Sequence, residues 1–295
     1  MVNDVPYEIR DPRFALLVRE AARLERLWTG GTWLEGPVHL PASGQLLFSD
    51  IPNDRTLRLD EVTGEVTVAE QPAGNQNGHT LDRDGRVLSC EHLSRSVTRT
   101  EHDGRRVVVA DRFEGKRLNS PNDVVVHSDG SVWFSDPTYG IDSDHEGKAS
   151  PSEIGASYVY RVDPTDGTVS AIVTDMVQPN GLAFSRDESI LYVADSGGSH
   201  RGADCPPVIR AYPVGADGRS VGPGETLATC EQGFFDGFRV DDHGNLWTSA
   251  ADGVHCLADD GTLLGKVLVP EVVANVELVG ARLYICATTS LYAIG

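Results

Sequence analysis

Short apolar runs, separated by polar turns, fill most of the chain after about residue 30. Segments such as LDRDGRVLSC, VHSDGSVWFSD and VDDHGNLWTSA carry Val, Leu, Phe and Trp on both sides of a D-G or D-x-G turn. Two strand-like runs joined by a turn of this kind are typical of a β-hairpin. Because the pattern recurs almost to the C-terminus, it predicts an all-β protein.

One stretch has a different period. In DPRFALLVREAARLERLW, residues 11–28, apolar side chains recur at three- and four-residue spacing, which is the spacing of one helix face. The residues concerned are Phe14, Leu17, Val18, Ala21 and Leu24. This spacing predicts a short N-terminal helix.

The hairpins belong to a longer repeat. Six copies of one unit can be aligned, and a period of about 40 to 60 residues favours the four-stranded blades of a propeller. The last copy ends early, and the unassigned piece ARLERLWTG near the N-terminus can supply its missing outer strand. We therefore expect a single six-bladed β-propeller over residues 1–295, in which residues 1–27 form a helical segment and the closing strand.

The first position of every copy holds an oxygen-bearing side chain. These positions are Glu35, Asn77, Asn122, Asn180, Asp236 and Asn275. The first strand of a propeller blade lines the central channel, so these six side chains, called here the oxygen ring, should converge. Asn-Gly and Asp-Gly pairs are also ordinary turn residues, which is the alternative interpretation. A set of converging side-chain oxygens that includes no His or Cys favours a hard divalent cation, first Ca²⁺ and then Mg²⁺ or Mn²⁺.

Several segments resemble a known family. WLEGPVHLPASGQLLFSD, RLNSPNDVVVHSDGSVWFSDPTYG, QPNGLAFSRDESILYVADS and FFDGFRVDDHGNLWTSA are similar to the gluconolactonase, senescence marker protein (regucalcin) and luciferin-regenerating enzyme family, and most closely to its bacterial gluconolactonases. The resemblance implies a six-bladed propeller that holds one divalent metal ion, Zn²⁺ being a further possibility, and hydrolyses sugar lactones. It implies that Glu35, Asn180 and Asp236 ligate the metal and that Asn122 lies at or beside it.

Further residues are candidates for the substrate and for support. Arg117 and Asn119 are displaced by three residues from the family's sugar-binding pattern, so their match is incomplete. Asp195 is expected to support Asn180, and Asn275 to lie behind the ligands. The other candidates for sugar contacts or pocket walls are Asn77, His79, His92, Tyr139, His145 and Phe235.

The expected reaction follows from this set. A cation with an open position can polarise a lactone carbonyl, and Asp236 can take a proton from the attacking water. In the rival interpretation Asp236 is a ligand only, and the metal activates the water. Two other functions stay open: a related metal-dependent propeller hydrolase acting on organophosphates, aryl esters or other lactones, and a calcium-binding propeller without enzymatic activity.

Charge and composition limit the classes of molecule that the protein is expected to bind. Forty-four acidic against 25 basic residues give a formal net charge of −19, which disfavours nucleic acid and anionic membranes as partners. No apolar run approaches the roughly 20 residues of a membrane helix, and no leader is recognisable. We expect a cytoplasmic monomer or weak dimer that binds a small sugar lactone, or a periplasmic one if a leader has been removed. Serine-hydrolase and nucleotide-binding motifs are lacking in the sequence.

Overall fold

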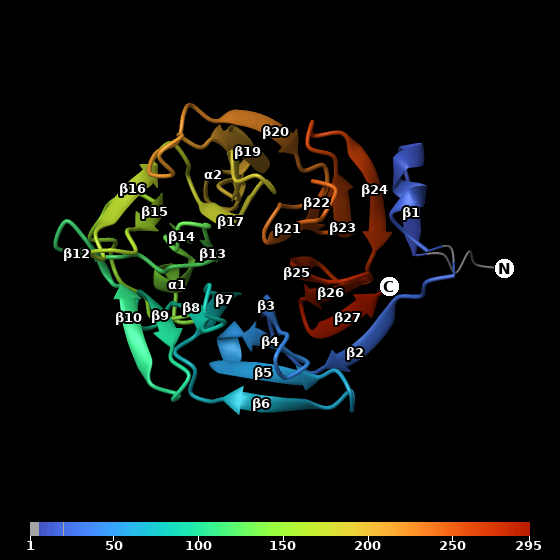
Figure 1. The fold of residues 1–295 in the computed structure, drawn as a ribbon, viewed down its shortest axis with the longest axis horizontal. Coiled ribbons are helices and arrows are strands. Elements are labelled where there is room, and N and C mark those ends of the chain that lie inside the picture. The colour runs from blue at the N-terminus through green and yellow to red at the C-terminus, as the bar shows by residue number, and fades with distance from the viewer. Residues whose placement is uncertain (1–5, 20) are drawn as a thin grey trace.

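Six four-stranded antiparallel blades surround a central axis in the computed structural model (Figure 1). The structure describes residues 6–19 and 21–295. Within each blade the strands follow one another from the axis outward, each paired with the next in sequence, except where the N-terminus completes the ring. This arrangement confirms the predicted all-β, six-bladed propeller.

The first three blades each come from one continuous part of the chain. Blade one comprises β3 (Leu34–Leu40), β4 (Gln45–Asp50), β5 (Arg55–Asp60) and β6 (Val66–Glu70). Blade two comprises β7 (Gln76–Leu81), β8 (Val87–Glu91), β9 (Ser96–Thr100) and β10 (Arg106–Ala110). Blade three comprises β13 (Val124–Val126), β14 (Val132–Asp136), β15 (Tyr158–Val162) and β16 (Val169–Val173).

The last three blades repeat this order, and the N-terminal strands join two of them. Blade four comprises β17 (Pro179–Phe184), β18 (Ile190–Asp195), β19 (Val208–Pro213) and β20 (Glu225–Thr229). Blade five comprises β21 (Phe238–Val240), β22 (Leu246–Ala250), β23 (Gly253–Leu257) and β24 (Leu263–Leu268). Blade six comprises β25 (Val273–Val279), β26 (Arg282–Ala287) and β27 (Ser290–Ile294).

The N-terminus closes the ring as the sequence predicts. Strand β2 (Glu25–Thr29) pairs antiparallel with β27 and becomes the outer strand of blade six. A shorter strand, β1 (Tyr7–Ile9), adds a fifth strand to the edge of blade five by pairing with β24. Sequence analysis did not predict β1, because three residues are too few to show an alternating pattern.

The N-terminal helix is shorter than the apolar spacing indicated. It is a 3₁₀ helix, η1 (Pro12–Leu16), whose first turn is capped by Asp11. Leu17 and Val18 already lie in a turn. Phe14 is fully buried in the core between blades five and six, and Leu17, Val18 and Leu24 pack against this core. Ala21 is exposed, and the neighbouring Ala22 is the buried residue. The helical spacing of apolar residues therefore indicated buried positions correctly for most of the segment, but it did not indicate a helix of several turns.

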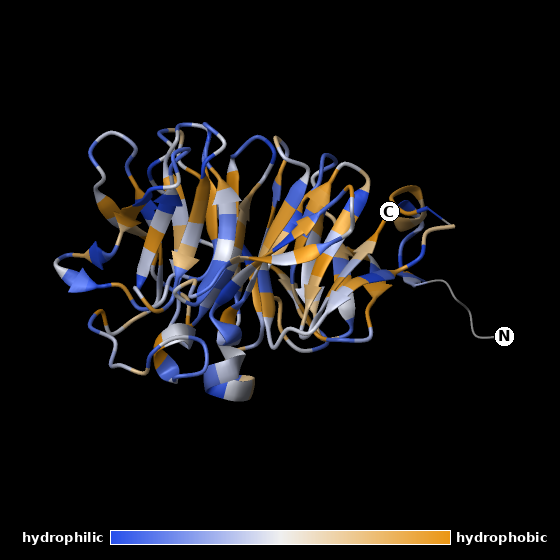
Figure 2. Ribbon diagram, turned by 90° about the horizontal axis from the view of Figure 1, so that it is seen from below, coloured by the Kyte–Doolittle hydropathy of each residue, from blue (hydrophilic) through white to orange (hydrophobic). Residues whose placement is uncertain are grey.

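The core lies between neighbouring blades. One cluster, for example, joins Leu88 and Cys90 of blade two to Phe134 and Tyr160 of blade three. Figure 2 shows the alternation of hydrophobic and hydrophilic residues along the strands that produces these interfaces. The described residues include no helix with the length and apolar character needed to cross a membrane.

Insertions project from one face of the disc as short helices and loops (Figure 2). They include α1 (Tyr139–Asp142) in blade three and α2 (Gly198–Arg201) in blade four. The remaining short elements are η2 (Ile51–Asn53), η3 (Gly202–Asp204) and the hairpin β11 (Arg112–Phe113) with β12 (Lys116–Arg117).

Candidate metal centre and active site

The innermost strands are irregular where the oxygen ring lies. In blades one, two, four and six the pairing with the second strand shifts register at the ring residue or beside it. In blades three and five the inner strand starts two residues after Asn122 and Asp236. A bulge or a strand end frees a side chain from the alternation of the sheet. The ring side chains can therefore turn toward the axis.

Glycines after the ring residues let adjacent blades approach each other. A Cβ on Gly181 would lie 2.2 Å from the carbonyl oxygen of Asp236, and one on Gly36 would lie 1.9 Å from that of Asn77. The Gly181 amide donates to that Asp236 oxygen at 3.2 Å. These glycines are needed for close packing between ring positions. The Glu-Gly and Asn-Gly pairs are thus not hairpin turns, and the turn interpretation is wrong for them.

Five of the six ring side chains line one cavity of about 170 Å³ at this end of the channel. Its lining includes Glu35, Asn77, Asn122, Asn180 and Asp236. Asn275 lies behind them, and its amide nitrogen donates to Glu35 Oε2 at 2.9 Å. The structure therefore brings together the four residues predicted as metal ligands, and Asn275 contacts one of them from outside the cavity lining.

Glu35 is buried and held by two hydrogen bonds. The Gly36 amide, 2.8 Å from Oε2, is the second donor beside Asn275. Burial raises the pKa of Glu35 above the usual carboxyl range, and the charges of Asp123 and Glu146 raise it further. The two hydrogen bonds oppose this shift. Glu35 is thus a fixed carboxylate, and among the described residues the charges that affect its pKa most strongly are other carboxylates.

Asp236 is in a similar position. Burial raises its pKa well above the usual range, and Glu35 is the largest charge that adds to the shift. Two carboxylates that disfavour each other's ionisation fit a divalent cation, which would neutralise both. Among the described residues, no group of three His, Cys, Asp or Glu side chains has metal-binding geometry. The candidate set differs from such groups because asparagine amides supply half of its oxygens.

Asn180 is oriented by its neighbours. Its amide nitrogen donates to Ser196 Oγ at 3.3 Å, and Ser196 donates in turn to the Phe235 carbonyl oxygen at 2.8 Å. This bond directs the amide oxygen away from Ser196. Asp195 accepts the backbone amides of Val177 and Gln178, so it holds the segment that leads into Asn180.

Comparison with known proteins identifies the family. The family model described as the SMP-30/gluconolactonase/LRE-like region matches residues 33–290. The chain belongs to this family. The result confirms the resemblance inferred from the sequence segments.

Individual relatives agree with this assignment. The chain is similar to a gluconolactonase of Zymomonas mobilis, with 30% identity over 87% of this chain and 75% of the relative. It is similar to a pentonolactonase of Haloferax volcanii, with 30% identity over 84% and 78%. The solved structure of a Xanthomonas campestris gluconolactonase aligns with a TM-score of 0.91 at 34% identity, covering 98% of this chain and 94% of that one.

Two histidines of this SMP-30/gluconolactonase/LRE-like protein support the ring without lining the cavity. His92 Nδ1 donates to the Glu146 carbonyl oxygen at 2.9 Å, which leaves Nε2 to accept from the Asn77 amide nitrogen at 3.4 Å. His79 Nδ1 donates to the Gly36 carbonyl oxygen at 2.7 Å. Burial lowers the pKa of each histidine to about 4, so both are neutral at pH 7. Their predicted contact with the sugar is not what the geometry shows.

The residues displaced from the family's sugar-binding pattern also lie elsewhere. The Asn119 amide nitrogen donates to the carbonyl oxygens of Asp136 and Ala156, and its oxygen accepts from Ser152. Arg117 donates to the Ser94 carbonyl oxygen from the small β11–β12 hairpin. Neither residue lines the cavity. Both side chains make hydrogen bonds within the fold, and their predicted contact with the sugar stays a prediction.

The cavity walls come mostly from residues that sequence analysis missed. Tyr139 lines the cavity as predicted, whereas His145 is exposed outside it and Phe234 takes the place expected for Phe235. The remaining lining residues are Trp33, Ile51, Glu146, Ser196 and Ser199. Glu146, Ser196 and Ser199 come from the two insertions, whose Gly- and Ser-rich composition was the available signal.

Proposed function

We propose that the protein is a sugar lactone hydrolase that uses one divalent metal ion to open an aldonolactone to the aldonic acid. The observation that carries this proposal is the pair of buried carboxylates Glu35 and Asp236, which line one cavity together with asparagine amides. Burial raises the pKa of both, and the charge of Glu35 adds to the shift of Asp236. The lactonase names of the relatives support the substrate class.

The donor set fits a hard cation. Glu35, Asn122, Asn180 and Asp236 would hold the ion, and Ca²⁺ is the first choice because every ligand is an oxygen. Such an ion polarises a carbonyl oxygen and stabilises the charge that grows as water attacks. Asn77 Oδ1 is buried without a hydrogen-bond partner and faces the same need for a donor or cation.

Asp236 is the proposed general base. Asp236 lines the cavity, and a carboxylate that holds the ion through one oxygen keeps its second oxygen free to accept a proton from the attacking water. The proton rests on a carboxylate oxygen of Asp236 while water adds to the lactone carbonyl. It is then available to the ring oxygen as the ester bond breaks, so that Asp236 returns to its starting state.

The insertion loops supply the contacts for the sugar. Glu146, Ser199 and Tyr139 present polar atoms to the cavity, and Tyr139 Oη lies 3.0 Å from Ser199 Oγ. These groups suit the hydroxyls of a sugar ring. Trp33 and Phe234 provide apolar surface at the same site, which suits the C–H faces of the ring.

The test is Asp236→Asn, which keeps the side chain's size and an oxygen ligand but removes the base. We expect kcat on an aldonolactone to fall by about a thousandfold or more, while thermal unfolding stays cooperative. Asp242→Asn is the matched control, because the Asp242 side chain is exposed and follows the end of β21 that is farther from Asp236. Turnover of Asp236→Asn at the level of this control would overturn the mechanism.

Metal removal tests the cofactor. After chelation we expect lactone hydrolysis to be lost and then restored by Ca²⁺, or by Mg²⁺, Mn²⁺ or Zn²⁺ if one of these is the native ion. The assay panel includes gluconolactone, pentonolactones, an aryl ester and a phosphotriester. Faster turnover of the phosphotriester would instead indicate a related propeller hydrolase. Metal binding without any turnover would indicate a calcium-binding propeller.

A further inference from the structure

A guanidinium lies in the axial channel just beyond the oxygen ring. Arg239, on β21 of blade five, is three residues after Asp236. Its Nε lies 2.8 Å from Glu277 Oε2 of blade six, and its Nη2 donates to the Pro37 carbonyl oxygen of blade one at 3.1 Å. One side chain thus spans the inner strands of three blades.

Two further oxygens complete its surroundings. Arg239 Nη1 donates to the Phe238 carbonyl oxygen at 3.0 Å and lies 4.0 Å from Asp123 Oδ2. Asp123 is only 2% exposed, and its Oδ2 has no hydrogen-bond partner among the residues that the structure describes. Arg239 is therefore surrounded by the carboxylates of Glu277 and Asp123 and by two backbone carbonyls, and the unpartnered Asp123 Oδ2 is one of these oxygens.

This surrounding has the composition of a calcium site. Carboxylate and backbone carbonyl oxygens are the ligands that Ca²⁺ takes in proteins. Although burial opposes the charged form, Glu277 and Asp123 raise the pKa of Arg239, so its charge is permanent. The guanidinium supplies a positive charge where a second cation would otherwise satisfy the same oxygens.

The charges in the channel can be counted. Glu35, Asp123, Glu146, Asp236 and Glu277 carry five negative charges when ionised, and Arg239 with one divalent ion supplies three positive ones. Without Arg239 the deficit grows from two to three, and a second divalent ion would reduce it to one. Buried carboxylates left without a counter-charge are strongly unfavourable, so a vacancy there would attract a cation.

We propose that Arg239 is a built-in cation that occupies a latent second metal site and limits the channel to one divalent ion. This proposal rests on the proposed function, in which the oxygen ring binds one divalent ion. Arg239 is then a positioning residue: it does not contact the substrate, and its positive charge next to the oxygen ring determines how many metal ions bind.

The experiment counts bound ions, independently of lactone turnover. Ca²⁺ stoichiometry is measured by titration calorimetry and by metal content after equilibrium dialysis, for the full chain and three variants. We expect one ion for the wild type and for Arg239→Lys, which keeps the charge. We expect two for Arg239→Ala, and one for Arg239→Ala/Glu277→Gln, which has lost both the guanidinium and a ligand.

Thermal unfolding gives a second measurement should Arg239→Ala fold poorly. Its melting temperature should rise more with millimolar Ca²⁺ than that of the wild type, because the second ion replaces the lost charge. An Arg239→Ala protein that binds one ion, or that stays unfolded in millimolar Ca²⁺, would overturn the inference. A wild type that binds no ion would instead overturn the metal of the proposed function, and a gain of one ion by Arg239→Ala would still support the channel site.

Discussion

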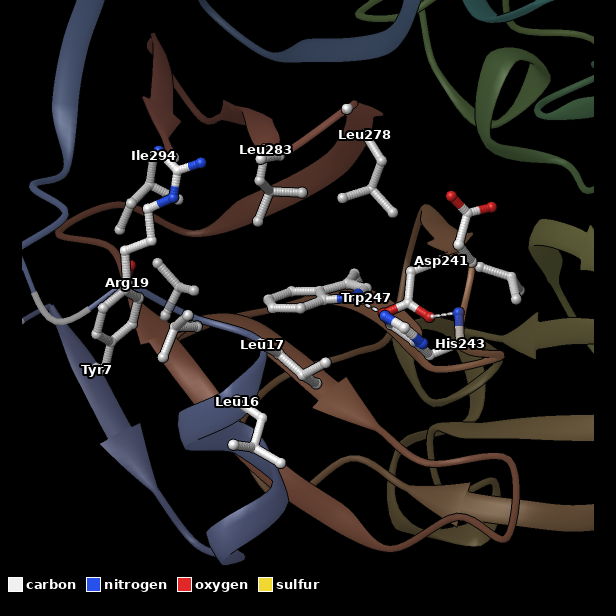
Figure 3. Close-up of a pocket in the computed structure, with 17 residues that line it drawn as sticks. Tyr7, Leu16, Leu17, Arg19, Asp241, His243, Trp247, Leu278, Leu283 and Ile294 are labelled. Carbon is white, nitrogen blue, oxygen red and sulfur yellow. Dashed lines mark hydrogen bonds between the residues drawn. The ribbon is translucent and has the colours of Figure 1, made fainter.

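The two ends of the inner strands carry two hollows whose acidic groups are in different situations. At the beginning of these strands is the cavity of about 170 Å³ that contains five residues of the oxygen ring. At the far end, under the N-terminal segment, is a cavity of about 410 Å³ lined by Leu17, Trp247, Leu278, Leu283 and Ile294 (Figure 3). The lining of this larger hollow also includes the charged residues Asp241 and Asp242.

The Asp241 carboxylate in the larger hollow is already hydrogen-bonded within its own turn and hairpin. Asp241 accepts the amides of His243 and Asn245, and its Oδ2 accepts the Trp247 indole N–H at 2.9 Å (Figure 3). These bonds lower the pKa of Asp241, despite its partial burial. In the smaller hollow the carboxylate pKa values are raised. The opposite shifts distinguish a carboxylate satisfied by its own turn from one that awaits a cation or substrate.

The strongest test of this contrast is Glu35→Gln. The substitution keeps the size of the side chain but removes one of two charges at the ring, so we expect metal affinity to fall by about a thousandfold. Asp241→Asn is the matched change in the larger hollow and should leave metal affinity unchanged. Titration calorimetry measures both. Equal losses in the two variants would mean that the contrast between the hollows is false.

Leu283→Ala tests whether the larger hollow contributes to stability but not to the reaction. Leu283 is 4% exposed and packs in the core beside this cavity, so truncation should lower the free energy of unfolding by about 2–4 kcal/mol. Urea denaturation measures this loss. The kcat/KM for the lactone should stay within about twofold of wild type. A large loss of kcat/KM in a folded Leu283→Ala protein would show that the larger hollow takes part in the reaction.

Glu146→Gln gives the smallest expected effect. If Glu146 accepts hydrogen bonds from sugar hydroxyls, losing its charge should raise KM about tenfold with little change in kcat. Glu153→Gln, in the same insertion, is the control, since Glu153 is exposed and accepts the Arg117 amide instead. Steady-state kinetics separate the two parameters. A fall in kcat at constant KM would move Glu146 from binding to the chemical step.

The fold and the ring were predictable because their signals are local and repeated. Each blade carries its own alternation of apolar and polar residues, and the ring residues recur at one phase of the repeat. The closing strand was predictable because the last blade lacked one strand. The alignment of six repeat copies placed Asn180 at the first position of its copy. A mistake in aligning one other copy would not have changed this placement.

The pocket walls were harder to predict because they depend on loops and on contacts distant in sequence. Glu146 and Ser199 reach the cavity from insertions that have no repeat to align. Asn119 kept its identity, but the shifted spacing placed its side chain against Ala156. Phe234 and Phe235 are adjacent, and only the path of the loop decides which one faces the cavity.

The closing strand has a consequence for how the protein is made. Thr29 pairs with Ser290, and the Asn275 amide bonds to Glu35, so residues from the two ends of the chain meet in blade six and at the ring. During synthesis, β2 cannot pair until β27, near the C-terminus, has been made. The oxygen ring is therefore assembled last, and a chain cut short before blade six would have neither a closed propeller nor a complete candidate metal centre.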